Sequence, residues 1–287
     1  MRRKTSEYSE IRAFEFVDIK ELPEKPRKKG VVEVRVPYYA ASPTLTYISD
    51  LLDTWGDYFD GMKFACGTMR LMHKDEVMEI IGLCHDHDVY VSTGGFVERV
   101  LVQGEDAVDR YFDECKELGY DVVEISSGFA QISLEDKLAM VRKVRKLGMK
   151  PKPEISLMIG AGAGTHTANY ETKLRPLKDF FAEAKAHIKS GAEIIMVESE
   201  GLTEDLPPEK WRKDVIMELI KKFGWERWMF EAADPEVFKW YLLNVSRDAN
   251  LFIDHTQVTE FNAWRLKLWG DPSIWKGKRL RYRGGSR

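Results

Sequence analysis

This sequence has few cysteines and no long apolar run. Its three cysteines, Cys66, Cys84 and Cys115, match no common metal-binding spacing, and an odd number in a chain this long is typical of free thiols in a reducing compartment. We therefore expect no disulfide. No apolar stretch approaches the roughly 18 residues of a membrane span, so no membrane contact is expected. The basic start of the chain is followed by no apolar signal segment, and we expect a cytoplasmic protein.

The chain also lacks the strong positive charge of a nucleic-acid-binding domain. Lys and Arg total 44 against 47 Asp and Glu, a formal net charge of -3, which argues against nucleic acid as a partner. The exception is the basic C-terminal tail, residues 271–287. We interpret this tail as a solvated end, with an oligomer contact or an anion-binding arm as the alternative, so a homo-oligomer remains open.

Short apolar segments alternate with longer amphipathic ones along the chain. We expect strands over residues 32–37, 62–65, 89–92, 122–126, 151–156, 193–198, 228–231 and 251–254. Apolar residues at three- and four-residue spacing predict helices over residues 44–59, 74–87, 107–118, 134–147, 174–189, 208–223, 235–245 and 258–268. Ser133 is placed to cap one of these helices, Pro235 suits the first turn of another, and Gly119 suits a helix end.

Eight strand-helix units predict an α/β fold, the (β/α)8 TIM barrel, which typically has about 250 residues. We expect a single barrel domain over residues 31–270, preceded by an N-terminal arm, residues 1–30. A doubly wound open sheet is the alternative. That fold usually carries a glycine fingerprint after its first strand, where this chain has Tyr38-Tyr39-Ala40-Ala41.

Charged side chains gather at the expected C-terminal ends of the strands, where TIM barrels carry their active sites. Because alternate side chains of a strand point the same way, the pattern directs these residues toward the barrel mouth: Arg35, Lys63, Ser92, Glu124, Ser126, Lys152, Glu154, Ser156, Glu198, Glu231 and Asp254. Such charges are costly to bury unless they pair, bind a metal or meet a charged ligand. We therefore expect a site here, with an internal salt-bridge network as the alternative. Oxygen ligands without a histidine or cysteine cluster favour Mg²⁺, and the cations suit an anionic substrate.

Two further segments follow the ends of expected strands. The run Gly160-Ala161-Gly162-Ala163-Gly164-Thr165-His166-Thr167 fits neither the nucleotide-binding nor the dinucleotide-binding glycine pattern. We interpret it as a flexible lid, with a backbone cradle for phosphate or sulfite as the alternative. His255 directly follows Asp254 and is a candidate for proton transfer or ligand contact.

Several spaced motifs in the same order resemble the phosphosulfolactate synthase family, and among its members the plant heat-stress-associated branch. The resemblance covers nearly all of residues 25–271. Its motifs are Lys25-Pro26-Arg27, Asp60-Gly61-Met62-Lys63-Phe64 with Gly67-Thr68, Val89-Tyr90-Val91-Ser92-Thr93-Gly94, Glu114-Cys115-Lys116-Glu117-Leu118-Gly119-Tyr120, Val123-Glu124-Ile125-Ser126, Ala192-Glu193-Ile194-Ile195-Met196-Val197-Glu198, Met229-Phe230-Glu231-Ala232-Ala233-Asp234 and Asp254-His255-Thr256-Gln257.

The resemblance implies a carbon-sulfur lyase that adds sulfite to phosphoenolpyruvate with Mg²⁺, giving 2-phospho-3-sulfolactate. Applied to this sequence, it implies three groups of residues. The candidate metal ligands are Glu124, Glu154, Glu198 and Glu231. The candidate substrate-binding residues are Arg35, Gly67, Thr68, Gly94, Gly95, Ser126 and Arg265. The candidate catalytic residues, which hold the substrate or return a proton, are Lys63, Lys152 and His255.

One motif departs from the archaeal synthases. They carry Glu-Val-Gly-Lys-Lys after the fifth strand, whereas this chain has Glu154-Ile155-Ser156-Leu157-Met158, and Lys152 stands two residues before the glutamate. Three functions stay open at this point: the synthase reaction, a related reaction on another phosphorylated acid, and a non-catalytic stress-tolerance protein that acts through a partner.

Overall fold

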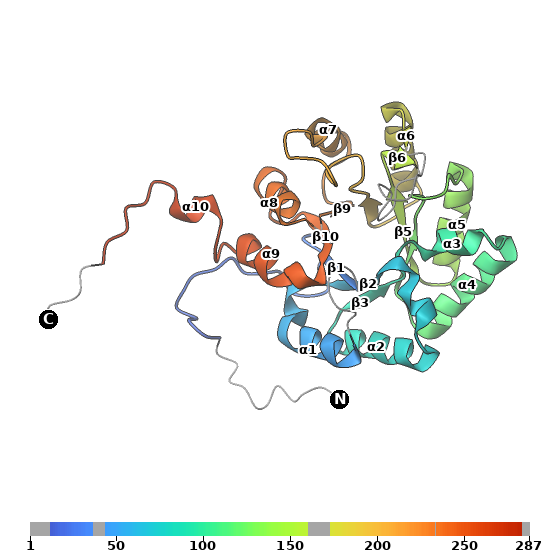
Figure 1. Cartoon of the computed structure of the whole chain (residues 1–287), viewed down its shortest axis with the longest axis horizontal. Coiled ribbons are helices and arrows are strands. Elements are labelled where there is room, and N and C mark those ends of the chain that lie inside the picture. Colours follow the sequence, from blue (N-terminus) through green and yellow to red (C-terminus); the bar gives the residue numbers. More distant parts are fainter. Residues whose placement is uncertain (1–11, 37–43, 160–172, 233, 283–287) are drawn as a thin grey trace.

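Eight parallel strands form a closed barrel in the order β1-β10-β9-β8-β5-β4-β3-β2 (Figure 1). The computed structural model describes residues 12–36, 44–159, 173–232 and 234–282. The barrel strands are β1 Val32–Val36, β2 Gly61–Phe64, β3 Tyr90–Ser92, β4 Val122–Ile125, β5 Lys150–Ile155, β8 Ile195–Val197, β9 Trp228–Glu231 and β10 Asn250–Asp254. The TIM barrel expected from the sequence is confirmed, and each strand lies within a residue or two of its expected place.

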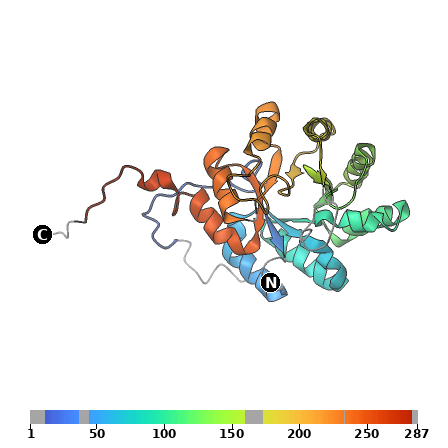
Figure 2. The ribbon, with the colours of Figure 1, turned by 45° about the horizontal axis from the view of Figure 1, so that its top comes forward.

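Helices surround the barrel on its outside (Figure 2). They are α1 Leu45–Trp55, α2 Lys74–Asp86, α4 Glu105–Leu118, α5 Leu134–Lys146, α6 Leu177–Lys189, α7 Lys213–Phe223, α8 Pro235–Asn244 and α9 Val258–Arg265. The expected end signals are present: the Ser133 hydroxyl accepts a hydrogen bond from Asp136 N at 3.1 Å, and Gly119 ends α4 with φ +95°. No helix in the described ranges combines the length and apolar character needed to cross a membrane.

Two expected helices are shorter at their start than the apolar spacing predicts. Helix α7 begins at Lys213 instead of residue 208, because residues 207–212 form turns in which Trp211 Nε1 donates to Leu206 O at 2.8 Å. Helix α6 begins after Pro176, and Lys173–Leu174 (β7) pairs instead with Met158–Ile159 (β6) as a small antiparallel sheet.

Short elements that the periodicity does not predict lie at the C-terminal ends of strands. The 3-10 turn η3 spans Ala65–Leu71 after β2, and η4 spans Gly94–Phe96 after β3. Helix α3, Val97–Leu101, continues directly from η4, and η6, His255–Gln257, follows β10. These elements form part of the rim around the barrel mouth.

The barrel interior contains a small apolar cluster and a group of charged side chains. Val31, Met196, Met229 and Phe252 form a small buried cluster, separate from the larger core between strands and helices. The strand register sets Arg35 beside Lys63 and Glu124 beside Lys152. Lys63 Nζ also lies 2.9 Å from Glu124 Oε1, so Arg35, Lys63, Glu124 and Lys152 form one charged layer inside the barrel.

The described part of the arm before β1, and Asp271 after α9, contact the opposite end of the barrel. Lys20 N donates to Leu266 O at 2.8 Å, Lys25 Nζ donates to Gly56 O at 2.7 Å, and Arg27 pairs with Asp60 at 2.9 Å. Asp271, where the expected tail begins, is buried and pairs with Arg247. Beyond it, helix α10, Pro272–Trp275, and the residues to 282 extend away from the barrel (Figure 1).

Candidate active site

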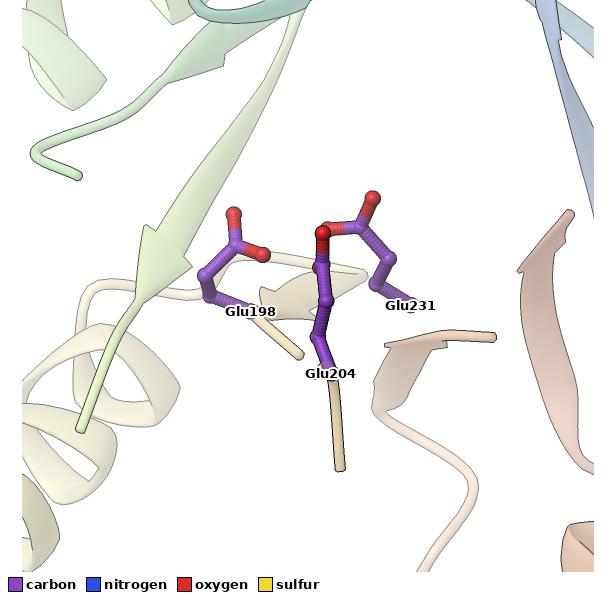
Figure 3. A group of neighbouring side chains, drawn as sticks. All are labelled: Glu198, Glu204 and Glu231. Atoms are coloured by element: carbon purple, nitrogen blue, oxygen red, sulfur yellow. The ribbon is translucent and has the colours of Figure 1, made fainter. Parts of the chain in front are cut away.

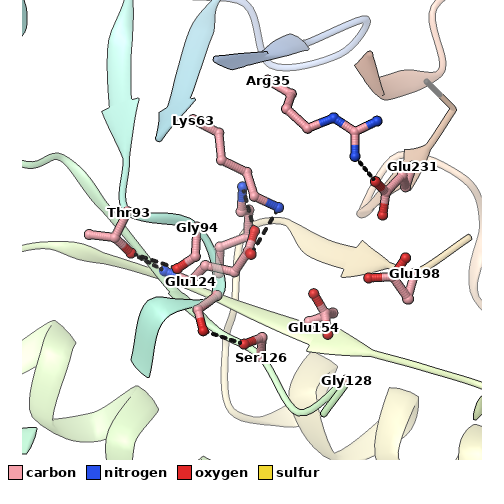
Figure 4. A network of polar contacts seen from close by, with 12 residues as sticks. Arg35, Lys63, Thr93, Gly94, Glu124, Ser126, Gly128, Glu154, Glu198 and Glu231 are labelled. Atoms are coloured by element: carbon pink, nitrogen blue, oxygen red, sulfur yellow. Dashed lines mark hydrogen bonds and ion pairs between the residues drawn. The ribbon is translucent and has the colours of Figure 1, made fainter. Parts of the chain in front are cut away.

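A cavity of about 460 Å³ opens at the C-terminal ends of the strands. It is lined by most of the residues that strand alternation and the family resemblance select: Arg35, Lys63, Gly67, Gly95, Glu124, Ser126, Glu154, Glu198 and Glu231. Figure 4 shows the charged side chains among them, Arg35, Lys63, Glu124, Glu154, Glu198 and Glu231, converging from strands β1, β2, β4, β5, β8 and β9. The strand pattern therefore locates this charged cavity correctly.

Lys63 lies at the centre of the charged layer. Its Nζ is 2.9 Å from Glu124 Oε1 and 4.1 Å from the centre of the Phe252 ring (Figure 4). Burial lowers the pKa of Lys63, but the surrounding carboxylates, Glu124 foremost, outweigh burial and hold the pKa above its usual value. Lys63 is therefore a protonated cation in the cavity.

Lys152 lies deeper in the barrel, because it stands two residues before Glu154 on the same strand. It is 3% exposed, pairs with Glu33, and lies 3.1 Å from Glu124 Oε2. It does not line the cavity. Burial raises the pKa of Glu124, but Lys63 and Lys152 outweigh burial and lower it, so Glu124 is a carboxylate held between two lysines.

Glu154 lines the cavity beside this pair. Burial, followed by the charge of Glu124, raises the pKa of Glu154 to about 8. Its Oε1 lies 3.5 Å from Ser127 N. Glu154 therefore keeps its proton to a higher pH than an ordinary glutamate does.

Three carboxylates on the far side of the cavity can hold a metal ion. Oxygen atoms of Glu198, Glu204 and Glu231 lie within 4.8 Å of one another (Figure 3). Burial and then Glu231 raise the pKa of Glu198 well above its usual value and also raise the pKa of Glu204. For Glu231, burial raises the pKa, but a hydrogen bond with Glu198 and the charge of Arg35, whose Nη1 lies 3.0 Å away, lower it. A divalent cation fits here, because it can replace the protons that these crowded carboxyls otherwise retain.

Glu98, on α3, fixes another part of the cavity wall. Its carboxylate accepts hydrogen bonds from Ser126 Oγ at 2.7 Å and from the backbone N–H groups of Gly128, Phe129 and Ala130 at 3.1, 2.9 and 2.7 Å. Gly128 and Phe129 line the cavity themselves. Glu98 therefore connects α3 to the loop after β4 and sets the shape of the wall between them.

The structure does not bring the remaining candidates into the cavity lining. His255 is buried, shares a 2.8 Å hydrogen bond between its Nδ1 and Tyr47 OH, and has its pKa lowered by burial. Thr68 Oγ1 donates to Ala65 O at 3.0 Å. Gly94 lies behind Lys63: a Cβ there would come 2.6 Å from Phe64 O.

Arg265 lies at the opposite end of the barrel from the expected substrate. Its Nη2 donates to Gly30 O, just before β1, at 2.6 Å, and burial lowers the pKa of the guanidinium to about 10. The expected substrate contact of Arg265 is thus not supported by its position. The glycine-rich run, residues 160–167, lies outside the described residues.

Glu98, Arg99 and Glu204 line the cavity but were not expected from the sequence. All three come from segments that follow a strand, and in such segments the alternation of strand residues does not predict where a side chain points. The one available signal for Glu204 is its place six residues after Glu198, in an acidic turn. Glu204 and Glu231 also line a neighbouring cavity of about 350 Å³, so the triad lies where the two cavities meet.

Comparison with known proteins gives relatives over nearly the whole barrel. Residues 20–271 match the family described as (2R)-phospho-3-sulfolactate synthase (ComA). The chain is 29% identical over 262 residues to the protein HEAT-STRESS-ASSOCIATED 32 of Arabidopsis thaliana, covering 87% of this chain and 90% of that protein. It is 26% identical over 252 residues to the phosphosulfolactate synthase of Methanothermobacter thermautotrophicus, covering 86% and 92%.

A solved structure shares the fold at much lower identity. KGPDC from Streptococcus mutans superimposes with a TM-score of 0.51 at 10% identity, covering 84% of this chain and all of that one. This likeness supports the barrel alone. The family match spans most of the sequence, including each strand that carries the charged cavity, and the chain belongs to the (2R)-phospho-3-sulfolactate synthase family.

Proposed function

We propose that this protein adds sulfite to phosphoenolpyruvate in the cytosol and releases 2-phospho-3-sulfolactate, in a reaction assisted by Mg²⁺. The observation that carries the proposal is the composition of one cavity: protonated Lys63 and the Arg35 guanidinium lie in the same space as three carboxylates that can hold a divalent cation. Family membership supports the substrate class, which is small and anionic.

The reaction needs one bond at each alkene carbon. The sulfur lone pair of sulfite attacks the methylene carbon and forms the C–S bond, and the electrons of the double bond move onto the neighbouring carbon and its carboxylate. A proton then reaches that carbon and forms the C–H bond. No redox partner is required, because the addition consumes one sulfite and one proton for each phosphoenolpyruvate.

Glu198, Glu204 and Glu231 are the residues that we assign to Mg²⁺. Glu124 and Glu154 were the other candidates, but Glu124 is already held by two lysines, and Glu154 lies outside the triad. When bound there, Mg²⁺ supplies positive charge close to the substrate carboxylate, where negative charge increases during the addition.

Lys63 and Arg35 act on the substrate from the charged layer. Arg35 is held beside Glu231 at 3.0 Å, and it can orient the carboxylate of a substrate that approaches the triad. Lys63 stays protonated through its contact with Glu124, so we assign to its ammonium group the proton that the substrate carbon receives. Lys152 and His255 do not line the cavity, so neither is assigned this role.

The test is incubation of the purified protein with phosphoenolpyruvate, sulfite and Mg²⁺, with product followed by mass spectrometry and ligand binding by thermal shift. Glu204→Gln should lose most turnover and weaken Mg²⁺ binding, whereas Glu218→Gln, on the exposed face of α7, should behave as wild type. No product and no thermal shift with a folded wild-type protein would falsify the proposal.

A non-catalytic role is the second candidate, favoured by the similarity to a plant protein named for heat stress and by the absence of the archaeal Lys-Lys pair after Glu154. Under this reading the barrel binds a partner, and neither phosphoenolpyruvate nor sulfite changes its unfolding temperature. A thermal shift with another phosphorylated acid, but not with phosphoenolpyruvate, would instead indicate a related enzyme with a different substrate.

A further inference from the structure

We propose that Arg99 binds the phosphate group of the substrate and that the substrate therefore lies across the cavity, with its carboxylate toward Glu198, Glu204 and Glu231. This inference rests on the proposed function and adds an orientation to it. It also assigns a role to an arginine that strand alternation did not select.

The strand order places Arg99 and the carboxylate triad on opposite sides of the mouth. In the closed barrel of eight strands, β3 and β9 are four strands apart, and β3 and β8 are three strands apart. Arg99 belongs to α3, which follows β3, whereas Glu198 and Glu204 follow β8 and Glu231 ends β9. All four residues line the same cavity. A ligand that reaches from one side to the other meets Arg99 at one end and the triad at the other.

The fold holds Arg99 at this rim. Val97 and Val100 are buried on either side of it, and Glu98 is fixed by its four hydrogen bonds to residues 126–130. The Arg99 side chain itself is exposed. Because its short helix is anchored through its neighbours, the backbone of Arg99 is held beside the cavity, and its guanidinium can reach a ligand there.

The charges in the cavity explain why Arg99 suits an incoming dianion. Arg35 and Lys63 already neutralise Glu231 and Glu124, at 3.0 and 2.9 Å. Among the residues that the structure describes, Arg99 has no ion pair. Its neighbour Glu98 does not neutralise it either, since that carboxylate is directed to the N–H groups of the loop after β4.

Two glycines near Arg99 line the cavity of about 460 Å³ and present no side chain to a ligand. They are Gly67, in the turn after β2, and Gly95, in the turn that leads into α3. An arginine guanidinium beside such a surface can donate two parallel hydrogen bonds to phosphate oxygens.

Sulfite is the other oxyanion that Arg99 could meet, and steady-state kinetics separate the two. The KM for phosphoenolpyruvate and the KM for sulfite are measured for wild type, Arg99→Ala, Arg99→Lys and the control Arg110→Ala, which removes an exposed arginine of α4. We expect Arg99→Ala to raise the KM for phosphoenolpyruvate roughly 10- to 100-fold. The KM for sulfite and the unfolding temperature should not change, and Arg99→Lys should recover part of the loss.

Binding of inorganic phosphate, measured by calorimetry in the absence of sulfite, tests the site independently of turnover. We expect wild type and Arg110→Ala to bind phosphate and Arg99→Ala to bind it at least about tenfold more weakly. A wild type that binds phosphate through Arg99 but never forms product would contradict the proposed function and leave this site standing. Equal phosphate binding by wild type and Arg99→Ala, no phosphate binding by wild type, or a rise in the sulfite KM alone, would overturn the assignment of Arg99.

Discussion

The two lysines beside Glu124 differ in what their removal should cost. Lys152 is buried in the barrel and pairs with both Glu33 and Glu124, so Lys152→Met leaves two buried carboxylates with one cation fewer. Removing one partner of a buried ion pair typically costs about 3–5 kcal/mol. An unfolding entropy of about 2.1 cal/mol/K per residue gives roughly 0.6 kcal/mol/K for this chain. The unfolding temperature should therefore fall by about 5–8 °C.

Lys63→Met should cost less stability than Lys152→Met and should lose most of its turnover. Glu124 keeps its contact with Lys152, and the methionine side chain can pack against the Phe252 ring that Lys63 now covers. We expect a stability loss of about 1.5–3 kcal/mol, the size of one lost charged hydrogen bond, and a loss of turnover of at least about 100-fold.

Thermal unfolding by circular dichroism and product formation by mass spectrometry measure the two effects on the same samples. Lys178→Met, an exposed exchange of the same kind on α6, serves as the matched control. The reasoning is refuted if Lys63→Met unfolds at a lower temperature than Lys152→Met, or if Lys63→Met retains wild-type turnover.

Three further predictions concern residues around the cavity and in the outer layer. Burial raises the pKa of Glu183, but hydrogen bonds and cations outweigh burial and hold it at about 2, below the usual 4.5. This depressed pKa stabilises the fold above pH 4.5, and the stabilisation is lost as the pH falls toward 2. In denaturant titrations over that range, the free energy of unfolding of wild type should fall by up to about 3 kcal/mol more than that of Glu183→Gln. Equal losses in the two proteins would contradict this. Glu98→Ala should speed amide hydrogen exchange at residues 128–130, because Glu98 accepts hydrogen bonds from these amides, and should lower turnover about tenfold or more. Unchanged amide exchange would contradict this role of Glu98. Gly95→Ala should lower the free energy of unfolding in urea by about 1–3 kcal/mol, because the added Cβ would lie 2.6 Å from Ser126 Oγ. An unchanged free energy of unfolding would show that this part of the cavity wall can move.

The barrel itself could be predicted from the sequence, because parallel strands buried on both faces give short apolar runs and the outer helices give amphipathic ones. The same logic located the cavity. Lys63 and Glu124 stand on the strand faces that the alternation indicates, and TIM barrels use the C-terminal ends of their strands.

Depth within the barrel was harder to predict than direction. Lys152 points inward as expected, but it lies two residues below Glu154, and strand alternation does not show which inward layer a ligand reaches. The direction of the Arg265 side chain was hard to predict because this residue lies on a helix, α9, and not on a strand. Its turn on α9 directs the guanidinium toward Gly30 at the far end of the barrel, and this direction depends on how the arm before β1 packs.

Glu98, Arg99 and Glu204 show what the sequence pattern leaves out. Glu98 finds its partners about 30 residues later in the chain, and Glu204 joins the triad through the turn after β8. Tertiary packing sets such positions, and no local periodicity encodes them.

The proposed reaction is tested most directly by ¹³C NMR of phosphoenolpyruvate labelled at its methylene carbon, mixed with sulfite and the wild-type protein. Our account predicts that the alkene signal is replaced by that of a saturated carbon bonded to sulfur, that this change requires Mg²⁺, and that Glu204→Gln slows it strongly. An unchanged alkene signal in the presence of Mg²⁺ and folded protein would contradict the account.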